Sequence, residues 1–252
     1  MFGKLWQRLN RVGASPIAEV DPLEAYQLWA ESYDNVNGNA LLFADARAVH
    51  PLVKGYQLSG KIVLDAGCGT GRNLEILTQD NPRLVAAADF SPNMLHRLGS
   101  KTNHCTSIIA QVARLESLPY KDALFDFVLC TLVLDHVPHL QRAVSELSRV
   151  LRPGGSMVAS CFHPFGKLLE WQRSFKAHVA KGQERWFAAR YYHHSHSDYY
   201  RSFQSTRLEI IDMMEPRIDE TLKPFYAKAG RADLFNRYNG CPLLLVYELR
   251  KQ

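Results

Sequence analysis

The chain has 252 residues, 46% of them hydrophobic and 22% charged, which is enough apolar material for one folded domain with a full core. Its net charge of +5 is far below that of a dedicated nucleic-acid-binding protein, and no run of about 20 apolar residues predicts a membrane span. The five cysteines are widely spaced and form no C-x-x-C pair, which predicts a reducing, cytoplasmic setting and no metal held by cysteines.

Residues 1–12 form the first recognisable element. A helix over this stretch would carry apolar side chains on one face and basic side chains mostly on the other. Such a helix fits a peripheral contact with an anionic membrane or a protein partner. It also fits a cap at the end of the domain, which is the commoner role of a terminus. We expect residues 1–55 as a whole to form an N-terminal helical cap.

From residue 61 onward, short apolar runs alternate with amphipathic stretches. This pattern is typical of a parallel sheet covered by helices on both faces, and predicts an α/β fold. A helix after the fourth strand should end at Pro153-Gly154-Gly155. We expect seven strands in a mostly parallel sheet, at residues 61–66, 84–88, 108–110, 125–132, 156–161, 208–214 and 242–249.

Residues 162–203 interrupt this rhythm. They hold 11 of the 27 aromatic residues and 5 of the 10 histidines, with seven Lys or Arg against three Asp or Glu. We interpret residues 162–205 as an aromatic and basic lid inserted after the fifth strand. His193, His194 and His196 do not change the expectation that no metal is bound, because adjacent histidines point in different directions on a regular element.

The strongest local signal is the stretch VLDAGCGTGRN, Val63 to Asn73, where the first strand meets a helix. Gly67, Gly69 and Gly71 allow a tight turn and a close approach of the backbone to a ligand. The spacing G-x-G-x-G differs from the G-x-G-x-x-G of dinucleotide-binding enzymes. Asp65 would repel a pyrophosphate, whereas it suits the ammonium group of an amino acid. This argues against a nicotinamide oxidoreductase, which titration with NADH would test.

Asp89 provides a second acidic group at the end of the second strand, 22 residues after Gly67. A carboxylate at this place accepts hydrogen bonds from both hydroxyls of an adenosine ribose. A ligand that combines an amino acid with an adenosine satisfies both carboxylates.

These motifs resemble the successive signatures of class I S-adenosylmethionine-dependent methyltransferases, particularly the branch related to ubiquinone and biotin biosynthesis enzymes. The resemblance covers about residues 60–160 and is carried by VLDAGCGTGRN, AADFSPNML, LESLPYKDALFDFVLC and LVLDHVPHLQRAVSELSRVLRPGG. Residues 25–40 are similar to the N-terminal segment of that branch. The resemblance implies a Rossmann-like fold, S-adenosyl-L-methionine as cofactor, and methyl transfer to an O, N or C nucleophile of a small molecule.

The resemblance also assigns roles to individual residues. Tyr33 would lie over the cofactor, Asp89 would bind the ribose, and Thr131 would form the floor beneath the sulfonium. The cofactor-binding residues expected on this basis are Tyr33, Asp65, Gly67, Cys68, Gly69, Gly71, Asp89, Phe90, Met94, Leu115 and Thr131.

One position departs from the family pattern. Arg114 stands where an aspartate or asparagine normally meets the adenine amino group, and arginine cannot accept a hydrogen bond. Three explanations remain open: the backbone near Leu115 recognises the adenine alone, Glu116 substitutes, or cofactor affinity is reduced. The last explanation keeps a non-catalytic scaffold or assembly partner among the candidate functions.

Methyl transfer needs alignment, exclusion of water and, for some acceptors, a base. Ligands of open parallel sheets bind at the carboxyl ends of the strands. Asp135 and His136 follow the fourth strand and His163 follows the fifth, so these three are the candidate catalytic residues, with His163 as the first choice.

We therefore expect a single domain in which residues 56–161 form the cofactor-binding core, residues 162–205 the acceptor lid, and residues 206–252 a C-terminal strand pair. A basic and aromatic lid suits an aromatic or lipophilic acceptor that bears an acidic group. Methylation of RNA or protein is the alternative, because basic and aromatic side chains also stack nucleobases. We do not expect nucleic acid, because the chain shows no appended binding module for it.

Overall fold

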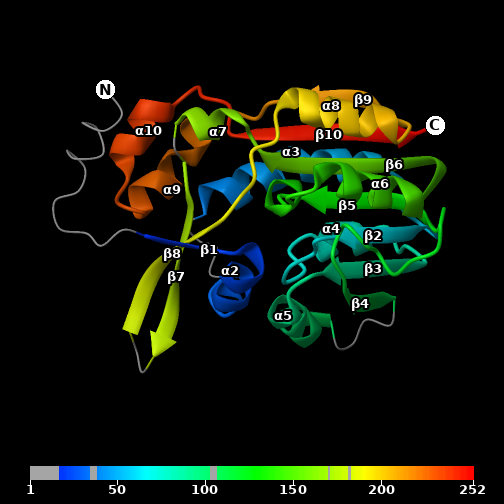
Figure 1. The fold of residues 1–252 in the computed structure, drawn as a ribbon, viewed down its shortest axis with the longest axis horizontal. Coiled ribbons are helices and arrows are strands. Elements are labelled where there is room, and N and C mark those ends of the chain that lie inside the picture. The colour runs from blue at the N-terminus through cyan, green and yellow to red at the C-terminus, as the bar shows by residue number, and fades with distance from the viewer. Residues whose placement is uncertain (1–16, 35–38, 103–106, 170, 181–182) are drawn as a thin grey trace.

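The computed structural model describes residues 17–34, 39–102, 107–169, 171–180 and 183–252, and its centre is a seven-stranded sheet (Figure 1). Five neighbouring strands pair in parallel, whereas the sixth strand in the order is antiparallel to both of its neighbours. The predicted Rossmann-like, mostly parallel sheet is thereby confirmed. In spatial order the strands are β4 (Ile108–Val112), β3 (Leu84–Asp89), β2 (Ile62–Ala66), β5 (Phe125–Thr131), β6 (Leu151–Phe162), β10 (Leu244–Lys251) and β9 (Leu208–Met214).

The order of the strands determines where a ligand site forms. The chain runs from β2 outward through β3 to β4, and then crosses back to place β5 on the other side of β2. The loops that follow β2 and β5 therefore leave the sheet in opposite directions. Such a reversal opens a crevice at the carboxyl edge of a parallel sheet.

Helices cover both faces of the sheet, because each strand buries alternate side chains on opposite sides. In β5, Phe127 packs into the core cluster on one face and Val128 into the cluster on the other. The first cluster receives apolar side chains from α3 (Ala40–Gly55), α4 (Leu74–Thr78), α5 (Pro92–Thr102) and α10 (Ala232–Tyr238). The second receives them from α6 (Leu140–Val150) and α8 (His196–Ser205).

The segment expected to be a lid divides into separate structures. A short helix comes first, and a hairpin follows that projects from the main sheet (Figure 1) and pairs with the N-terminal strand in a second, three-stranded sheet. Trp29 stacks on Phe175 of the hairpin with ring centroids 4.7 Å apart, which joins α2 to the hairpin. The elements are α7 (Phe165–Leu168), β7 (Arg173–Ala180), β8 (Gln183–Ala189), β1 (Ala18–Val20) and α2 (Pro22–Trp29).

The last part of the expected lid is a core helix. Ser195 and Asp198 form a capping box that starts α8. Tyr199 is 1% and Phe203 0% exposed, and both pack in the cluster that includes Tyr247 of β10. The predicted boundary at residue 205 therefore includes a helix that covers the main sheet, and the part that projects ends before Ser195.

Both ends of the described chain contain more than the sequence indicates. The expected helical cap contains α2 and α3, and also β1. The expected C-terminal strand pair contains η2 (Glu220–Leu222), α9 (Lys223–Lys228) and α10 between its strands. The amphipathic stretch at residues 1–12 lies outside the described residues. Among the residues described, no helix has the length and apolar character that a membrane span requires.

The position of α8 gives a stability prediction. Replacing Phe203 by alanine should lower the free energy of unfolding by about 3–5 kcal/mol, because the side chain is fully buried. Tyr200 lies on the same helix, is 55% exposed, and should change stability by no more than about 0.5 kcal/mol when replaced by alanine. Urea unfolding of both variants measures the difference. Equal, small effects would show that α8 does not pack on the sheet.

Candidate functional site

The carboxyl edge of the sheet holds a cavity at the crossover between β2 and β5. Its walls come from the glycine-rich loop after β2, the end of β3, the loops after β4 and β5, α2, and Tyr192. Eight of the eleven residues expected to bind the cofactor line it, namely Tyr33, Gly67, Cys68, Gly69, Asp89, Phe90, Leu115 and Thr131. Asp65, Gly71 and Met94 are not part of its wall. Met94 is fully buried and packs in a cluster that includes Phe90.

The glycine-rich loop is held to the neighbouring strand by its backbone. The N–H groups of Gly67 and Cys68 both donate to the Ala88 carbonyl, at 2.7 and 3.0 Å. Gly67 has a φ of +78°, and a Cβ at this position would overlap the Val133 side chain. Gly69 also has a positive φ, of +55°, and a Cβ there would meet open space. The loop thus brings bare backbone to the cavity.

Asp89 is held at the end of β3 by two backbone N–H groups. Gly69 donates to Oδ2 and Ser91 donates to Oδ1, each at 2.8 Å. The carboxylate is 6% exposed, and its burial raises its pKa to about 6. Each oxygen accepts one of these bonds and keeps further acceptor capacity. The group is therefore oriented to accept hydrogen bonds from a ligand with neighbouring hydroxyls.

Two buried atoms of opposite charge lack partners below the loop. Asp65 Oδ2 and Arg72 Nη1 make no hydrogen bond among the described residues. Burial raises the pKa of Asp65 to about 7, an effect that the positive charge of Arg72 opposes. An ammonium at Asp65 and a carboxylate at Arg72 would satisfy both atoms. The charges present therefore match the amino-acid end of S-adenosylmethionine, with Arg72 in the cavity wall and Asp65 buried outside it.

A polar network holds Arg72 in this orientation. Its Nη2 donates to Asp45 Oδ2 at 2.7 Å and to Thr131 Oγ1 at 3.1 Å. Asn73 Nδ2 also donates to Thr131 Oγ1, at 2.9 Å. Thr131 thus lines the cavity and accepts two hydrogen bonds, and Nη1 is the part of the guanidinium left without a partner.

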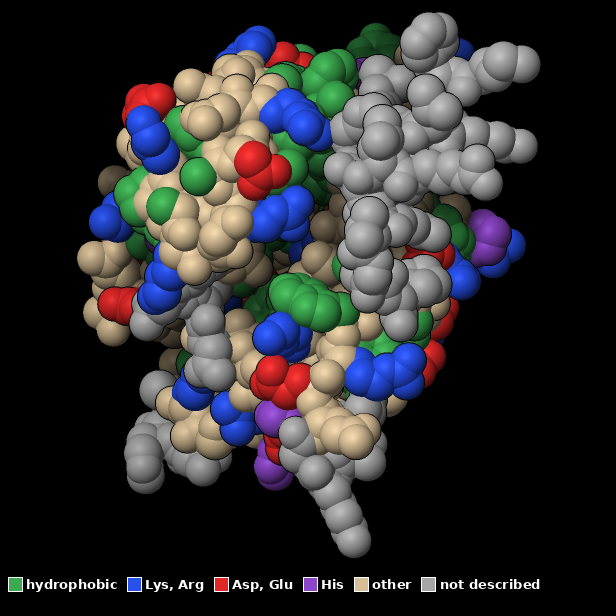
Figure 2. Space-filling view, turned by 90° about the vertical axis from the view of Figure 1, so that its left-hand side faces the viewer, with side chains coloured by type: hydrophobic (Ala, Val, Ile, Leu, Met, Phe, Trp, Pro, Cys, Tyr) green, Lys and Arg blue, Asp and Glu red, His purple; other side chains and the backbone are tan. Residues whose placement is uncertain are grey.

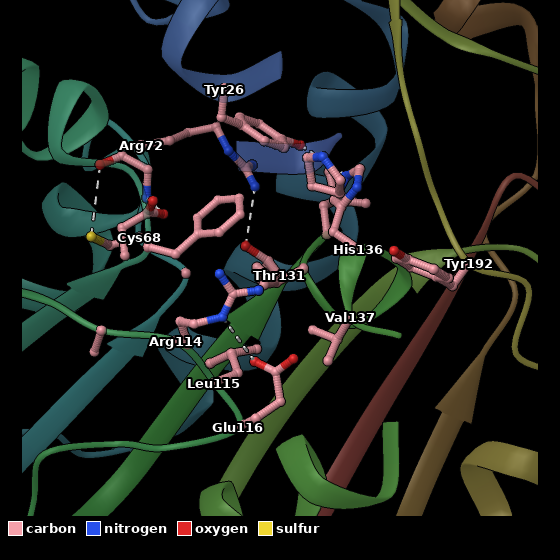
Figure 3. A pocket seen from close by; sticks show the side chains of 18 of the residues that line it. Tyr26, Cys68, Arg72, Arg114, Leu115, Glu116, Thr131, His136, Val137 and Tyr192 are labelled. Atoms are coloured by element: carbon pink, nitrogen blue, oxygen red, sulfur yellow. Dashed lines mark hydrogen bonds and ion pairs between the residues drawn. The ribbon is translucent and has the colours of Figure 1, made fainter. Parts of the chain in front are cut away.

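Aromatic side chains of the N-terminal segment cover another wall. The ring centroid of Tyr26 lies 6.1 Å from that of Tyr33 and 6.0 Å from that of Phe90. Tyr26 hydroxyl donates to His136 Nε2 at 3.0 Å. In Figure 3, Cys68 and Arg72 lie on the glycine-loop side of the cavity, and His136 and Tyr192 lie on the opposite side.

His136, in η1 (Leu134–His136), lines the cavity with both ring nitrogens engaged. Its Nδ1 lies 2.9 Å from the Arg190 carbonyl, which only accepts, so Nδ1 carries the proton. Nε2 is then the acceptor for Tyr26 and for Arg173. Burial, with a further contribution from Arg173, lowers the pKa of His136 to about 4. The ring is therefore neutral at physiological pH.

Asp135 lies behind His136 and outside the cavity wall. Its Oδ2 accepts from Arg173 at 3.2 Å, and both side chains are 3% exposed. The Tyr192 N–H donates to the Asp135 carbonyl at 2.6 Å, and His194 Nε2 donates to the Val137 carbonyl at 2.8 Å. These contacts join the loop after β5 to β7 and to the segment that follows β8.

His163, the first choice for a base, does not line this cavity. Its Nδ1 accepts from Phe165 N–H at 3.0 Å, so the proton lies on Nε2, which donates to Glu215 at 3.2 Å. His196 Nε2 is 3.7 Å from the same carboxylate. The atoms of the three residues that could coordinate a metal lie within 4.8 Å of one another. A metal bound at His163 Nε2 would need a proton on Nδ1, facing the Phe165 N–H. We interpret this group as a link between β6, α8 and β9.

The loop after β4 brings Arg114, Leu115 and Glu116 to one side of the cavity (Figure 3). Leu115 is buried. The Arg114 side chain is 62% exposed, whereas that of Glu116 is 18% exposed, and Arg114 Nε lies 4.0 Å from Glu116 Oε2.

Five cavity residues with polar side chains were not expected from the sequence: Asp21, Tyr26, Arg72, Asn73 and Tyr192. Tyr26, Trp29 and Tyr33 recur at helical spacing, which is a signal that assigns them to one face. Arg72 and Asn73 directly follow Gly71, so their proximity to the loop was readable. No comparable signal identifies Arg173, because its contacts with Asp135 and His136 join positions far apart in the chain.

Comparison with known proteins finds similarity to methyltransferases. A family model described as a methyltransferase domain matches residues 64–159. The malonyl-[acyl-carrier protein] O-methyltransferase of Herminiimonas arsenicoxydans is 33% identical over 150 residues, which are 54% of this chain and 55% of that protein. The chain spans about half the length of the first curated relatives it matches.

Solved structures share the fold at low sequence identity. An S-adenosylmethionine-dependent methyltransferase from Mesorhizobium loti has a TM-score of 0.59 and 22% identity, and the match covers 80% of this chain and 96% of that one. The [4+2]-cyclase SpnF has a TM-score of 0.66 and 19% identity, covering 94% and 97%. The structural likeness therefore extends to a protein described as a cyclase. The fold alone does not determine the reaction, which depends on the residues of the site.

The neutral state of His136 gives a pH prediction. Its pKa is lowered in the fold, so the unfolded chain binds a proton first as pH falls below about 6.5. The stability associated with this group is complete above pH 6.5 and is lost as pH falls toward 4. Between pH 7.5 and 5.0, wild type should lose about 2 kcal/mol more stability than a His136→Gln variant.

Urea unfolding at the two pH values measures this difference. The buried carboxylates Asp65 and Asp89 shift stability with pH in the opposite sense, but they are present in both proteins and cancel in the comparison. Parallel pH profiles for wild type and variant would contradict a neutral, buried His136.

Proposed function

Because the chain belongs to the class I S-adenosylmethionine-dependent methyltransferase superfamily, we propose that it transfers the methyl group of S-adenosyl-L-methionine to a small-molecule acceptor. The observation that supports this most directly is the set of three groups around the glycine-rich loop. Asp89 is oriented by two backbone N–H groups, and Asp65 and Arg72 each present a buried atom without a partner. Together they match a ribose, an ammonium and a carboxylate.

The proposal gives the chain's own residues distinct tasks. When bound, S-adenosylmethionine supplies a methyl group on a positively charged sulfur. Asp65, Arg72 and Asp89 hold the two ends of this molecule, and the loop of Gly67, Cys68 and Gly69 approaches it closely, while Tyr33, Phe90 and Leu115 exclude water. No covalent enzyme intermediate is needed, because the methyl carbon is already activated.

Tyr26 and His136 have a positioning role in this proposal. Since Nε2 of His136 accepts from the Tyr26 hydroxyl, the phenol oxygen keeps acceptor capacity for a proton-bearing group of the acceptor. The low pKa of His136 makes it a weak base. We assign to Asp135 the task of holding Arg173 beside His136, and we give His163 no catalytic task.

For the acceptor we propose an aromatic or lipophilic molecule with an acidic group. Tyr26, Tyr192 and Pro138 supply apolar surface to the cavity wall, and the exposed Arg114 supplies positive charge beside it. Figure 2 shows Lys and Arg side chains spread over the face of the molecule on the side of α9, α10 and the β7–β8 hairpin. A reducing, cytoplasmic setting is part of the proposal, since the four described cysteines are free.

The acceptor proposal is tested with S-adenosylmethionine carrying a labelled methyl group. We expect label in small aromatic or lipophilic acids, and at least about tenfold slower transfer by an Asp89→Asn variant, which weakens charge-assisted bonds to the ribose. Label recovered in RNA or protein instead would support that alternative. Binding of the cofactor without transfer to any acceptor would support the scaffold.

The raised pKa of Asp65 predicts how cofactor affinity depends on pH. An ammonium binds the ionised carboxylate, and the free protein holds a proton there below about pH 7. Affinity for S-adenosylhomocysteine should therefore rise with pH between 5.5 and 7, by up to about tenfold per pH unit, and level off by 7.5. Calorimetry measures the profile. An Asp65→Asn variant should bind more weakly with a flatter profile, and a flat wild-type profile would contradict this role.

A further inference from the structure

The adenine side of the cavity poses a specific chemical problem. Asp89 is placed for the ribose, so the base must lie beyond it, where Ala113 N–H donates to the Asp89 carbonyl at 2.9 Å and the loop after β4 begins. The exocyclic amino group of adenine is a hydrogen-bond donor. Arg114 has five donors and no acceptor, so it cannot receive that bond. Another group of this loop must accept that hydrogen bond, or the amino group makes no hydrogen bond with the protein.

Among the residues that the structure describes, three carboxylate side chains line the cavity. Asp89 is oriented toward the ribose by its bonds from Gly69 and Ser91. Asp21 belongs to the opposite, N-terminal wall, where it caps α2 by accepting from Leu23 N–H at 3.0 Å. Glu116 is the remaining carboxylate, and it belongs to the loop that borders the base.

The backbone of this loop is fixed on both sides of Glu116. Ser117 N–H donates to the Arg114 carbonyl at 3.1 Å, which closes a turn around Leu115 and Glu116. Leu118 N–H donates to Glu146 at 2.8 Å, and Arg149 donates to the Leu118 carbonyl at 3.0 Å. The position from which the Glu116 side chain enters the cavity is therefore well determined.

We propose that Glu116 reads the adenine amino group in place of residue 114, and that Arg114 supports it as a positively charged neighbour. Arg114 Nε lies 4.0 Å from Glu116 Oε2, too far for a hydrogen bond, so the carboxylate keeps its acceptor capacity. The more exposed Arg114 places a positive charge beside Glu116 without occupying its oxygens. This inference rests on the proposed function, because it assumes that an adenosyl cofactor occupies the cavity.

The test changes the ligand and the residue together. One ligand is S-adenosylhomocysteine, and the other is its analogue with hydrogen in place of the 6-amino group, so that ring nitrogens and ribose are unchanged. Calorimetry gives both affinities for wild type, Glu116→Gln and Glu116→Ala. The ratio of the two affinities within one protein does not depend on how much of that protein is folded, and the three ratios isolate the coupling between residue and amino group.

We expect wild type to bind the adenine ligand about 10- to 100-fold more tightly than the analogue, as for a hydrogen bond to a charged acceptor. The ratio should fall in Glu116→Gln, whose amide oxygen is a neutral and weaker acceptor, and approach one in Glu116→Ala. If Glu116 only stabilised the loop, its replacement would weaken the binding of both ligands by the same factor. Arg114→Ala should retain a preference for the adenine ligand, because arginine does not accept the bond.

Ratios that are equal in wild type and both Glu116 variants would overturn the inference while leaving the cofactor assignment intact. A ratio lost in Arg114→Ala but kept in Glu116→Ala would likewise overturn it. Failure of folded wild type to bind either ligand would overturn the proposed function as well.

Discussion

The hydrogen bond from Gly69 N–H to Asp89 is the contact on which the site depends. It joins the loop after β2 to the end of β3, and so connects the group that would hold a ribose to the turn that would approach an amino acid. Gly69 has a positive φ at this contact, and the bond orients a carboxylate that burial would otherwise disfavour in its charged form. Strand order adds the crevice above it, because β5 returns to the other side of β2.

A second constraint closes the far side of the cavity. Arg173 of β7 reaches the loop after β5, where it pairs with buried Asp135 and contacts His136. Removing one partner of such a pair would leave a buried charge unpaired, which typically costs 3–5 kcal/mol. The hairpin is thus attached to the core through a polar contact beside His136. The Tyr26–His136 bond attaches α2 to the same loop. One segment that precedes the cofactor-binding core in the chain and one that follows it therefore meet at one cavity.

How much of this was predictable follows from the range of the interactions. The parallel core was readable because each strand, turn and helix carries a local signal, such as the glycines after β2 or the buried run in β5. The pairing of β1 with β8 joins residues far apart in the sequence. Strand β1 has only three residues and no strong hydrophobic pattern, so the sequence did not predict this strand or its partner. Helix α8 was assigned to a lid because its aromatic residues look alike whether they face a substrate or the core. Tyr199 and Phe203 face the core.

The candidate site shows the same division. Gly67, Gly69 and Asp89 were predicted from spacing and resemblance to bind the cofactor, and all three line the cavity. His163 was placed before His136 from the sequence, but both follow parallel strands. Only the hydrogen bonds of each ring distinguish a residue in the cavity wall from one linked to Glu215. The role of Arg72 depends on Asp45 and Thr131, which are distant in the sequence. They bind its Nη2 and leave its Nη1 without a partner.

A crystal structure of the protein with S-adenosylhomocysteine tests the central claim most directly. We predict the amino group of the ligand within about 3 Å of Asp65 Oδ2, its carboxylate at Arg72 Nη1, and its ribose hydroxyls at Asp89, all at hydrogen-bond distance. Binding of the ligand elsewhere, or in the cavity with its amino-acid end away from Asp65 and Arg72, would contradict the account.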